Sequence, residues 1–248
     1  MRIVPRAMGA ISRRLGRPEL LAVVDATARE AQREAVAVNA VLAASLRATG
    51  IYVDVGTNRG QVLREALRAA PHGTHIAFEP IPALAAQVAR EFPGVDCRQK
   101  ALGGTVATAE FCHFRRRQGW SGLRRSPDIS DREGDPEFIK VDVSTLDVEL
   151  AGVTPNLLKI DVEGAELGVL EGGRELLRTG RPLVIFEHVY AAAALYGTPP
   201  GAPWDLLEDL GYDVFSVTGQ GPCTRAAFVT GAGAGTVNWL AVPRASRP

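Results

Sequence analysis

The chain reads IYVDVGTNRGQVLREAL over residues 51–67. An apolar, β-branched run ends there in Asp54, and Gly56 and Gly60 bracket a short turn that leads directly into a helical pattern. Glycine lets the backbone approach a ligand closely, and the first amides of a helix are free to donate hydrogen bonds. The stretch predicts a strand, a tight turn and a helix, with either a polar ligand at the turn or a purely structural turn. The G-x-G-x-x-G pattern of dinucleotide-binding folds is absent, which argues against a pyrophosphate ligand.

Short apolar runs alternate with helical stretches through the rest of the chain, which is typical of a parallel sheet with helices on both faces. Strands are expected at 51–55, 75–79, 95–99, 157–162, 182–188, 212–217 and 236–242, and helices at 60–70, 81–92, 164–179 and 203–210. The predicted fold class is therefore α/β, with a doubly wound sheet built from these strands.

Two segments fall outside this alternation. Residues 19–48 contain no proline or glycine and predict one or two helices, so we interpret residues 1–49 as an N-terminal helical extension of a domain at 50–248. Between about 104 and 150, two strand-like segments flank a polar stretch rich in arginine and glycine. This pattern predicts an insertion that could cover a substrate.

Composition narrows the class of protein further. The 248 residues are 46% hydrophobic and 23% charged, as in ordinary globular proteins. The 28 basic and 28 acidic residues cancel, which removes the overall charge expected of a nucleic-acid binder. No apolar run is long enough to span a membrane, and the three cysteines indicate neither a disulfide framework nor a zinc site. We therefore expect a cytoplasmic protein.

Acidic residues follow the predicted strands. Glu79 ends the second strand, 23 residues after Gly56, where a carboxylate can accept hydrogen bonds from both hydroxyls of a ribose. The segment LLKIDVEGAELGVLEGG (157–173) places Asp161 at the end of a buried strand. Glu163 and Glu166 come next, and acids at the start of a helix also stabilise the helix dipole.

The segment LVIFEHVY (183–190) puts Glu187 and His188 at the end of the following strand. A single histidine is more often structural than catalytic. The ends of neighbouring parallel strands meet over one crevice, however, so the Asp161 carboxylate and the His188 imidazole could act there together as a base. Asp161, Glu163 and His188 could also bind Mg²⁺ or Mn²⁺, although we favour a reaction without a metal.

The order of these motifs resembles the FkbM family of S-adenosylmethionine-dependent methyltransferases. The resemblance covers about residues 51–242 and rests on DVGTNRG, FEP, KALGG (100–104), STLD (144–147), LKIDVEGAELGVLEGG, FEH and VNWLAV. It implies a Rossmann-like class I methyltransferase fold, with a seven-stranded, mostly parallel sheet whose last strand is antiparallel. It also implies S-adenosylmethionine as cofactor and O-methylation of a hydroxyl on a sugar or natural-product acceptor.

The resemblance also implies roles for individual residues. The glycine turn would contact the methionine end of the cofactor, and Glu79 would bind its ribose. The segment after the third strand would lie near the adenine, and Asp161 would lie beside the sulfonium. In full, the implied cofactor-binding residues are Asp54, Gly56, Thr57, Asn58, Gly60, Glu79, Lys100, Ala101, Leu102 and Asp161. Asp161 and His188 are the candidate catalytic residues, and Ser121 of GWSGL (119–123) either approaches the site or belongs to a plain turn.

Three other functions remain open from the sequence. A nicotinamide-dependent oxidoreductase could use a similar sheet, and a non-catalytic binding protein could keep the fold without turnover. Nucleic-acid methylation could use an arginine cluster in the insertion, but acids follow it at once and would offset its charge. The cluster comprises Arg115, Arg116, Arg117, Arg124 and Arg125, and the acids are Asp128, Asp131, Glu133, Asp135 and Glu137. We expect a small-molecule acceptor with a hydroxyl group, no nucleic-acid partner, and a chain that could form a homodimer.

Overall fold

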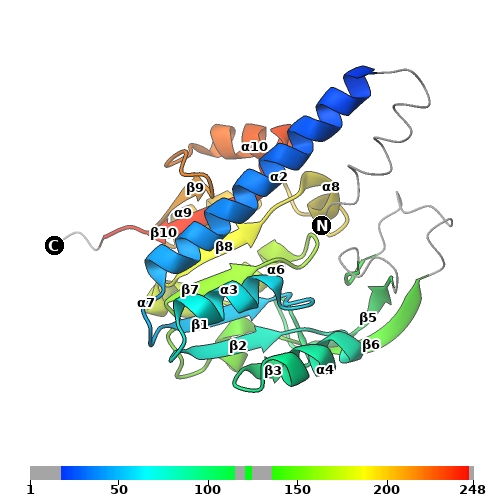
Figure 1. The fold of residues 1–248 in the computed structure, drawn as a ribbon, viewed down its shortest axis with the longest axis vertical. Helices are drawn as coiled ribbons and strands as arrows, with labels where there is room; N and C mark the ends of the chain where they lie inside the picture. The colour runs from blue at the N-terminus through cyan, green and yellow to red at the C-terminus, as the bar shows by residue number, and fades with distance from the viewer. Residues whose placement is uncertain (1–17, 115–120, 125–135, 246–248) are drawn as a thin grey trace.

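The computed structural model describes residues 18–114, 121–124 and 136–245 (Figure 1). Residues 1–17 of the N-terminal extension and every arginine of the insertion cluster except Arg124 lie outside the described residues. Among the described residues, no helix is both long and apolar enough to cross a membrane.

A seven-stranded sheet forms the centre of the molecule, with the order β3-β2-β1-β7-β8-β10-β9. Neighbouring strands run parallel except β10, which is antiparallel to both β8 and β9. This arrangement confirms the predicted mostly parallel sheet with an antiparallel last strand. The strands are β1 (Ile51–Val55), β2 (Thr74–Phe78), β3 (Asp96–Arg98), β7 (Leu157–Ile160), β8 (Leu183–Glu187), β9 (Tyr212–Ser216) and β10 (Asn238–Pro243).

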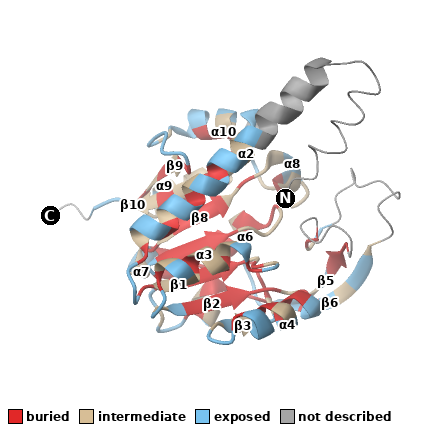
Figure 2. Cartoon of the chain, in the orientation of Figure 1, coloured by how far each residue is buried: buried red, intermediate tan, exposed pale blue. Residues whose placement is uncertain are grey.

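Helices cover both faces of this sheet, so its strands are buried (Figure 2). One face packs against α2 (Pro18–Ser45), α3 (Gln61–Ala69) and α4 (Pro82–Glu91). The other face packs mainly against α5 (Leu146–Glu149), α6 (Glu166–Glu171), α7 (Arg174–Gly180), α9 (Ala202–Asp209) and α10 (Arg225–Ala234). A short helix, α8 (Tyr190–Ala194), follows β8.

The helix expected at 164–179 is two helices, α6 and α7, and Gly172 and Gly173 explain the break. A Cβ on Gly172 would lie 2.1 Å from the carbonyl oxygen of Gly103, and one on Gly173 would lie 2.7 Å from the side chain of Leu146. The two glycines therefore let another part of the backbone pass close to the chain, and the helix is interrupted at that point.

The predicted insertion and residues 101–102 just before it form a second, three-stranded sheet with the order β4-β6-β5. Its strands are β4 (Ala101–Leu102), β5 (Ala107–His113) and β6 (Glu137–Ser144), and β5 and β6 pair in antiparallel fashion. Phe111, Val141 and Val143 pack against Ile81 and Leu84 beside α4. This small core fixes the second sheet next to the carboxyl end of β2.

The alternation of side chains along the strands decides which groups share a face. Asp54 on β1 lies opposite Lys159 on β7, which lies opposite Ile185 on β8. Side chains in register on adjacent strands point to the same face, and every second residue returns to it. Asp54, Lys159, Asp161 and Glu187 therefore form one polar row, at the carboxyl edge of the face that α2 and α3 cover.

The long helix α2 is fixed to the sheet by a buried acid. Glu34 is 1% exposed and accepts hydrogen bonds from the Val237 backbone N–H (3.1 Å) and from Nδ2 of Asn238 (2.8 Å). These bonds connect the helix to the start of β10, some 200 residues later in the sequence.

We expect Glu34→Ala to lower the free energy of unfolding by about 1–3 kcal/mol, because two donors lose their acceptor. Urea unfolding of the purified chain measures the change, with Gln32→Ala on the exposed side of the same helix as the control. The control should stay within about 0.5 kcal/mol of the unmodified protein. Equal stability of the two variants would contradict this role for Glu34.

Candidate active site

A cavity of about 470 Å³ opens at the carboxyl ends of β1, β2 and β7. The glycine turn after β1 lines one side, and Phe111, Ser121 and Leu123 of the second sheet and its connection line another. Nine of the ten residues predicted to bind a cofactor line it, namely Asp54, Gly56, Thr57, Asn58, Glu79, Lys100, Ala101, Leu102 and Asp161. The tenth, Gly60, does not line the cavity. It packs against the ring of Phe92, because a Cβ at this position would lie 2.5 Å from that ring.

Gly56 brings the first and third sequence motifs together. Its φ angle is +81°, and a Cβ at this position would lie 1.8 Å from the carbonyl oxygen of Asp161. The backbone N–H groups of Gly56 and Thr57 both donate to the carbonyl of Phe78, at 3.0 and 3.1 Å. The turn is therefore folded across the ends of β2 and β7, and only glycine fits at its first position.

Glu79 holds the same turn from the side of β2. Its Oε2 accepts from the Asn58 backbone N–H at 2.8 Å, and its Oε1 accepts from that of Ile81 at 2.9 Å. Burial raises the pKa of Glu79 to about 7, and the two hydrogen bonds offset part of this effect. Each carboxylate oxygen still has a lone pair for a ligand hydroxyl. The sequence predicted the ligand role of Glu79 but not its contact with the turn.

Lys159 lies between the acids of β1 and β7. Its Nζ is 3.1 Å from Oδ2 of Asp161 and 3.6 Å from Oδ1 of Asp54, and the residue is 6% exposed. Burial alone would lower the pKa of Lys159, but the two aspartates raise it well above its ordinary value. The sequence analysis missed this residue, although a lysine within the apolar run LLKI is a visible signal.

The two aspartates differ in their environment. Asp54 is 1% exposed, and neither of its carboxylate oxygens has a hydrogen-bond partner among the described residues. Burial raises the pKa of Asp54, and Lys159 offsets only part of this effect. Burial would also raise the pKa of Asp161, but Lys159 and a hydrogen bond with Glu187 hold it below its ordinary value. Asp161 is thus the carboxylate best suited to stay ionised beside a substrate.

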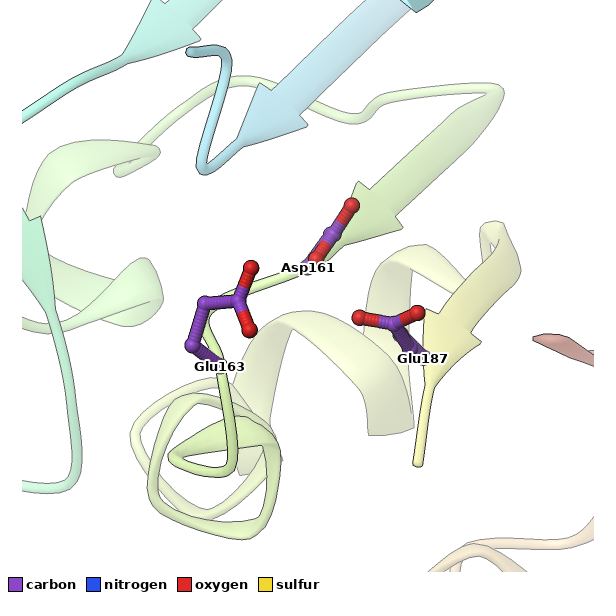
Figure 3. A group of neighbouring side chains, drawn as sticks. All are labelled: Asp161, Glu163 and Glu187. Atoms are coloured by element: carbon purple, nitrogen blue, oxygen red, sulfur yellow. The ribbon is translucent and has the colours of Figure 1, made fainter. Parts of the chain in front are cut away.

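Two more acids converge on Asp161 (Figure 3). One carboxylate oxygen from each of Asp161, Glu163 and Glu187 lies within 4.8 Å of the other two. Burial and the charge of Asp161 raise the pKa of Glu163 to about 8, and the same two causes raise that of Glu187 well above its ordinary value. This end of the site is therefore rich in carboxyl groups.

The structure does not bring His188 to the cavity. Its ring is stacked on that of Phe228, with centroids 5.3 Å apart, and the residue is 1% exposed. Glu187 is the last residue of β8, and the backbone N–H of His188 after it still donates to the Val237 carbonyl at 2.7 Å, so the two side chains point to opposite faces of the sheet. The expected pair of Asp161 and His188 is thus not assembled, and the set of acids beside Asp161 contains Glu187 where the sequence suggested His188.

The other expected residues are in place. Ser121 lines the cavity, and its Oγ accepts from the Phe114 backbone N–H at 3.0 Å. Lys100 lines it as well, with its Nζ held by Oε1 of Glu149 at 2.7 Å. Ala101 and Leu102 contribute an apolar wall on the same side.

Lys159→Met should lower the free energy of unfolding by about 3 kcal/mol, because it leaves two buried carboxylates without their counter-ion. Chemical denaturation monitored by circular dichroism measures this loss. Lys140→Met, at an exposed lysine of β6, is the matched control and should change stability by less than about 0.5 kcal/mol. If the Lys159 variant is as stable as the control, the ion pairs described here do not stabilise the fold.

The chain is similar to known proteins. The model of the methyltransferase FkbM domain matches residues 54–214, which is more than half of the chain. Methyltransferase 1 of Beauveria bassiana (strain ARSEF 2860) is 32% identical over 142 residues, which are 48% of this chain and 57% of that protein. The chain therefore spans little more than half the length of this relative.

The crystal structure of methyltransferase FkbM from Methylobacillus flagellatus KT has the same fold. It superposes with a TM-score of 0.50 and 14% sequence identity, over 79% of this chain and 44% of that one. The match to the FkbM domain over more than half of the chain shows that the chain belongs to the FkbM methyltransferase family.

Proposed function

We propose that this protein transfers a methyl group from S-adenosylmethionine to a hydroxyl oxygen of a small acceptor, of the sugar or natural-product class. The observation that carries the proposal is that one cavity is lined by the glycine turn, Glu79 and Asp161 in a member of the FkbM family. Its volume of about 470 Å³ lies within the usual range for small-molecule sites.

The residues present fit the cofactor. The buried Asp54 carboxylate has no hydrogen-bond partner among the described residues, so it suits the ammonium group at the methionine end. The free lone pairs of Glu79 suit the ribose hydroxyls. Ala101 and Leu102 provide an apolar surface for the adenine. The lack of a side chain at Gly56 lets the turn pack against the Asp161 carbonyl, so a ligand held by the turn would lie beside Asp161.

The bound cofactor supplies a methyl group on a positively charged sulfur, and transfer to oxygen forms an O–C bond while the S–C electron pair returns to sulfur. The protein must then position the acceptor, exclude water and remove the hydroxyl proton. We assign proton removal to Asp161, which Lys159 keeps ionised. A positioned base of this kind accelerates a reaction by about 10²–10⁴-fold. Phe111, Ser121 and Leu123 border the space left for the acceptor.

Calorimetric titration with S-adenosylhomocysteine tests the cofactor site, with NAD as the control ligand and Glu79→Ala as the control protein. We expect micromolar binding of S-adenosylhomocysteine, no binding of NAD, and weaker binding by the variant. Absence of binding, or binding of NAD alone, would overturn the proposal. Binding would justify measuring transfer of a labelled methyl group to sugars and polyketides with free hydroxyls.

The pH dependence of this binding gives an independent test of Glu79. With a pKa of about 7, the carboxyl is mainly protonated at pH 6 and mainly ionised at pH 8. Only the ionised form can accept hydrogen bonds from both hydroxyls while keeping both backbone bonds. We therefore expect the affinity for S-adenosylhomocysteine to rise about tenfold from pH 6 to pH 8.

Glu79→Gln is the control for this measurement, because an amide does not titrate in that range. The variant should bind more weakly and with little dependence on pH, since its amide can accept from only one of the two backbone donors. The same pH profile in both proteins would show that another group is responsible.

A further inference from the structure

Asp161 and Glu163 of the main cavity have, together with the neighbouring Glu187, the spacing of metal ligands. Asp161 follows β7, Glu163 lies in the loop after it, and Glu187 ends β8, so the carboxylates come from two neighbouring strand ends (Figure 3). Their oxygens lie within 4.8 Å of one another. Oxygen ligands bind Mg²⁺ or Ca²⁺ at about 2.0–2.6 Å, so two ligands of one ion lie at most about 5 Å apart.

A second cavity beside this cluster contains an acceptor without a donor. It has a volume of about 180 Å³ and is lined by Glu163, Glu187 and Glu166, with Gly164, Val189 and Ala192. Glu166 is 1% exposed, and its Oε1 accepts from the Val162 and Gly164 backbone N–H groups at 3.0 and 3.1 Å. Its Oε2 is buried without a hydrogen-bond partner among the described residues. A buried carboxylate oxygen in this state is costly unless a ligand approaches it.

Among the described residues, no basic side chain forms an ion pair with the acids around this second cavity. Lys159 is already shared between Asp54 and Asp161. In the described part of the chain, no lysine or arginine forms a salt bridge with Glu163, Glu166 or Glu187. A donor set made only of carboxylate oxygens suits hard divalent cations such as Mg²⁺, Mn²⁺ and Ca²⁺.

We propose that a hard divalent cation binds between Asp161, Glu163 and Glu187, with Glu166 as a further ligand directly or through a metal-bound water. These ligands differ from the set suggested by the sequence, because Glu187 and not His188 faces Asp161. Binding of the cation does not depend on the proposed function. A role of the cation in catalysis does rest on the proposed function. Asp161 and Glu163 also line the main cavity, where an ion would orient the acceptor hydroxyl and lower its pKa.

Direct binding of Mn²⁺ to the purified full chain tests this proposal without any activity measurement. The protein is first freed of metal with a chelator and then titrated with MnCl₂, and electron paramagnetic resonance follows the free ion. We expect one Mn²⁺ per chain with a Kd below about 1 mM, displaced by Mg²⁺ or Ca²⁺. Glu187→Gln, which keeps the shape of the side chain, should weaken binding at least about tenfold.

Two variants serve as controls. Glu171→Gln changes an exposed acid of α6 outside the cluster, and His188→Asn removes the alternative ligand. Both should bind Mn²⁺ like the unmodified protein. If Glu187→Gln does not fold, as judged by circular dichroism, Glu163→Gln in the loop after β7 takes its place with the same expected loss.

No bound Mn²⁺ up to about 1 mM would overturn the proposal, because the acids would then be balanced by protons or by a cationic group of the acceptor. The proposal would also be overturned if Glu187→Gln left the affinity for Mn²⁺ unchanged, or if His188→Asn abolished Mn²⁺ binding. These outcomes are independent of the titration with S-adenosylhomocysteine, so a failure of the metal site and a failure of the cofactor site can be distinguished.

Discussion

A buried ammonium group, that of Lys159, lies between two carboxylates at adjacent strand ends. Without it, Asp54 and Asp161 would be neighbouring negative charges at the same edge of the sheet. Two ionised carboxylates in such a place repel each other strongly, and one would take up a proton. Lys159 thus allows β1 and β7 to end in acids side by side. The polar row along this edge depends on that charge balance.

The close approach of Gly56 to the Asp161 carbonyl adds a geometric constraint to this electrostatic one. Because the turn touches the end of β7 directly, a ligand held by the turn also lies beside Asp161. Glu79 extends the constraint to β2, since it binds the turn through Asn58 while facing the cavity. Loss of Glu79 would therefore change the shape of the turn as well as remove a ligand contact. The proposed cofactor contact and the geometry of the turn thus depend on the same carboxylate.

The sequence predicted the glycine turn, the sheet and the acids because each is a local pattern. Parallel strands present their carboxyl ends at one edge, so an acid after each strand suffices to predict a shared crevice. His188 rather than Glu187 was expected beside Asp161, but successive side chains at the end of β8 point to opposite faces of the sheet, and Glu187 is the one on the face of Asp161. Phe186 belongs to the core beneath α10, and His188 shares its face, whereas Ile185 and Glu187 share the other. The apolar environments of Ile185 and Phe186 depend on helices far away in the sequence, so the run LVIFEH alone does not reveal which face borders the site.

The two ends of the cavity differ in how their residues are brought together. The end proposed to hold the cofactor comes from turns that directly follow β1 and β2 and from the segment after β3, so its residues occur in short motifs. The end proposed to hold the acceptor combines Phe111, Ser121 and Leu123 of the second sheet with the loop after β7. Its position depends on long-range pairing of β5 with β6 and on a separate small core. Motifs can therefore identify the family and the residues proposed to bind the cofactor, while the surface proposed to bind the acceptor is assembled only in the folded chain. Substitutions in β5, in the connection at 121–123 and at the end of β8 are accordingly the ones expected to change acceptor choice without disturbing the glycine turn.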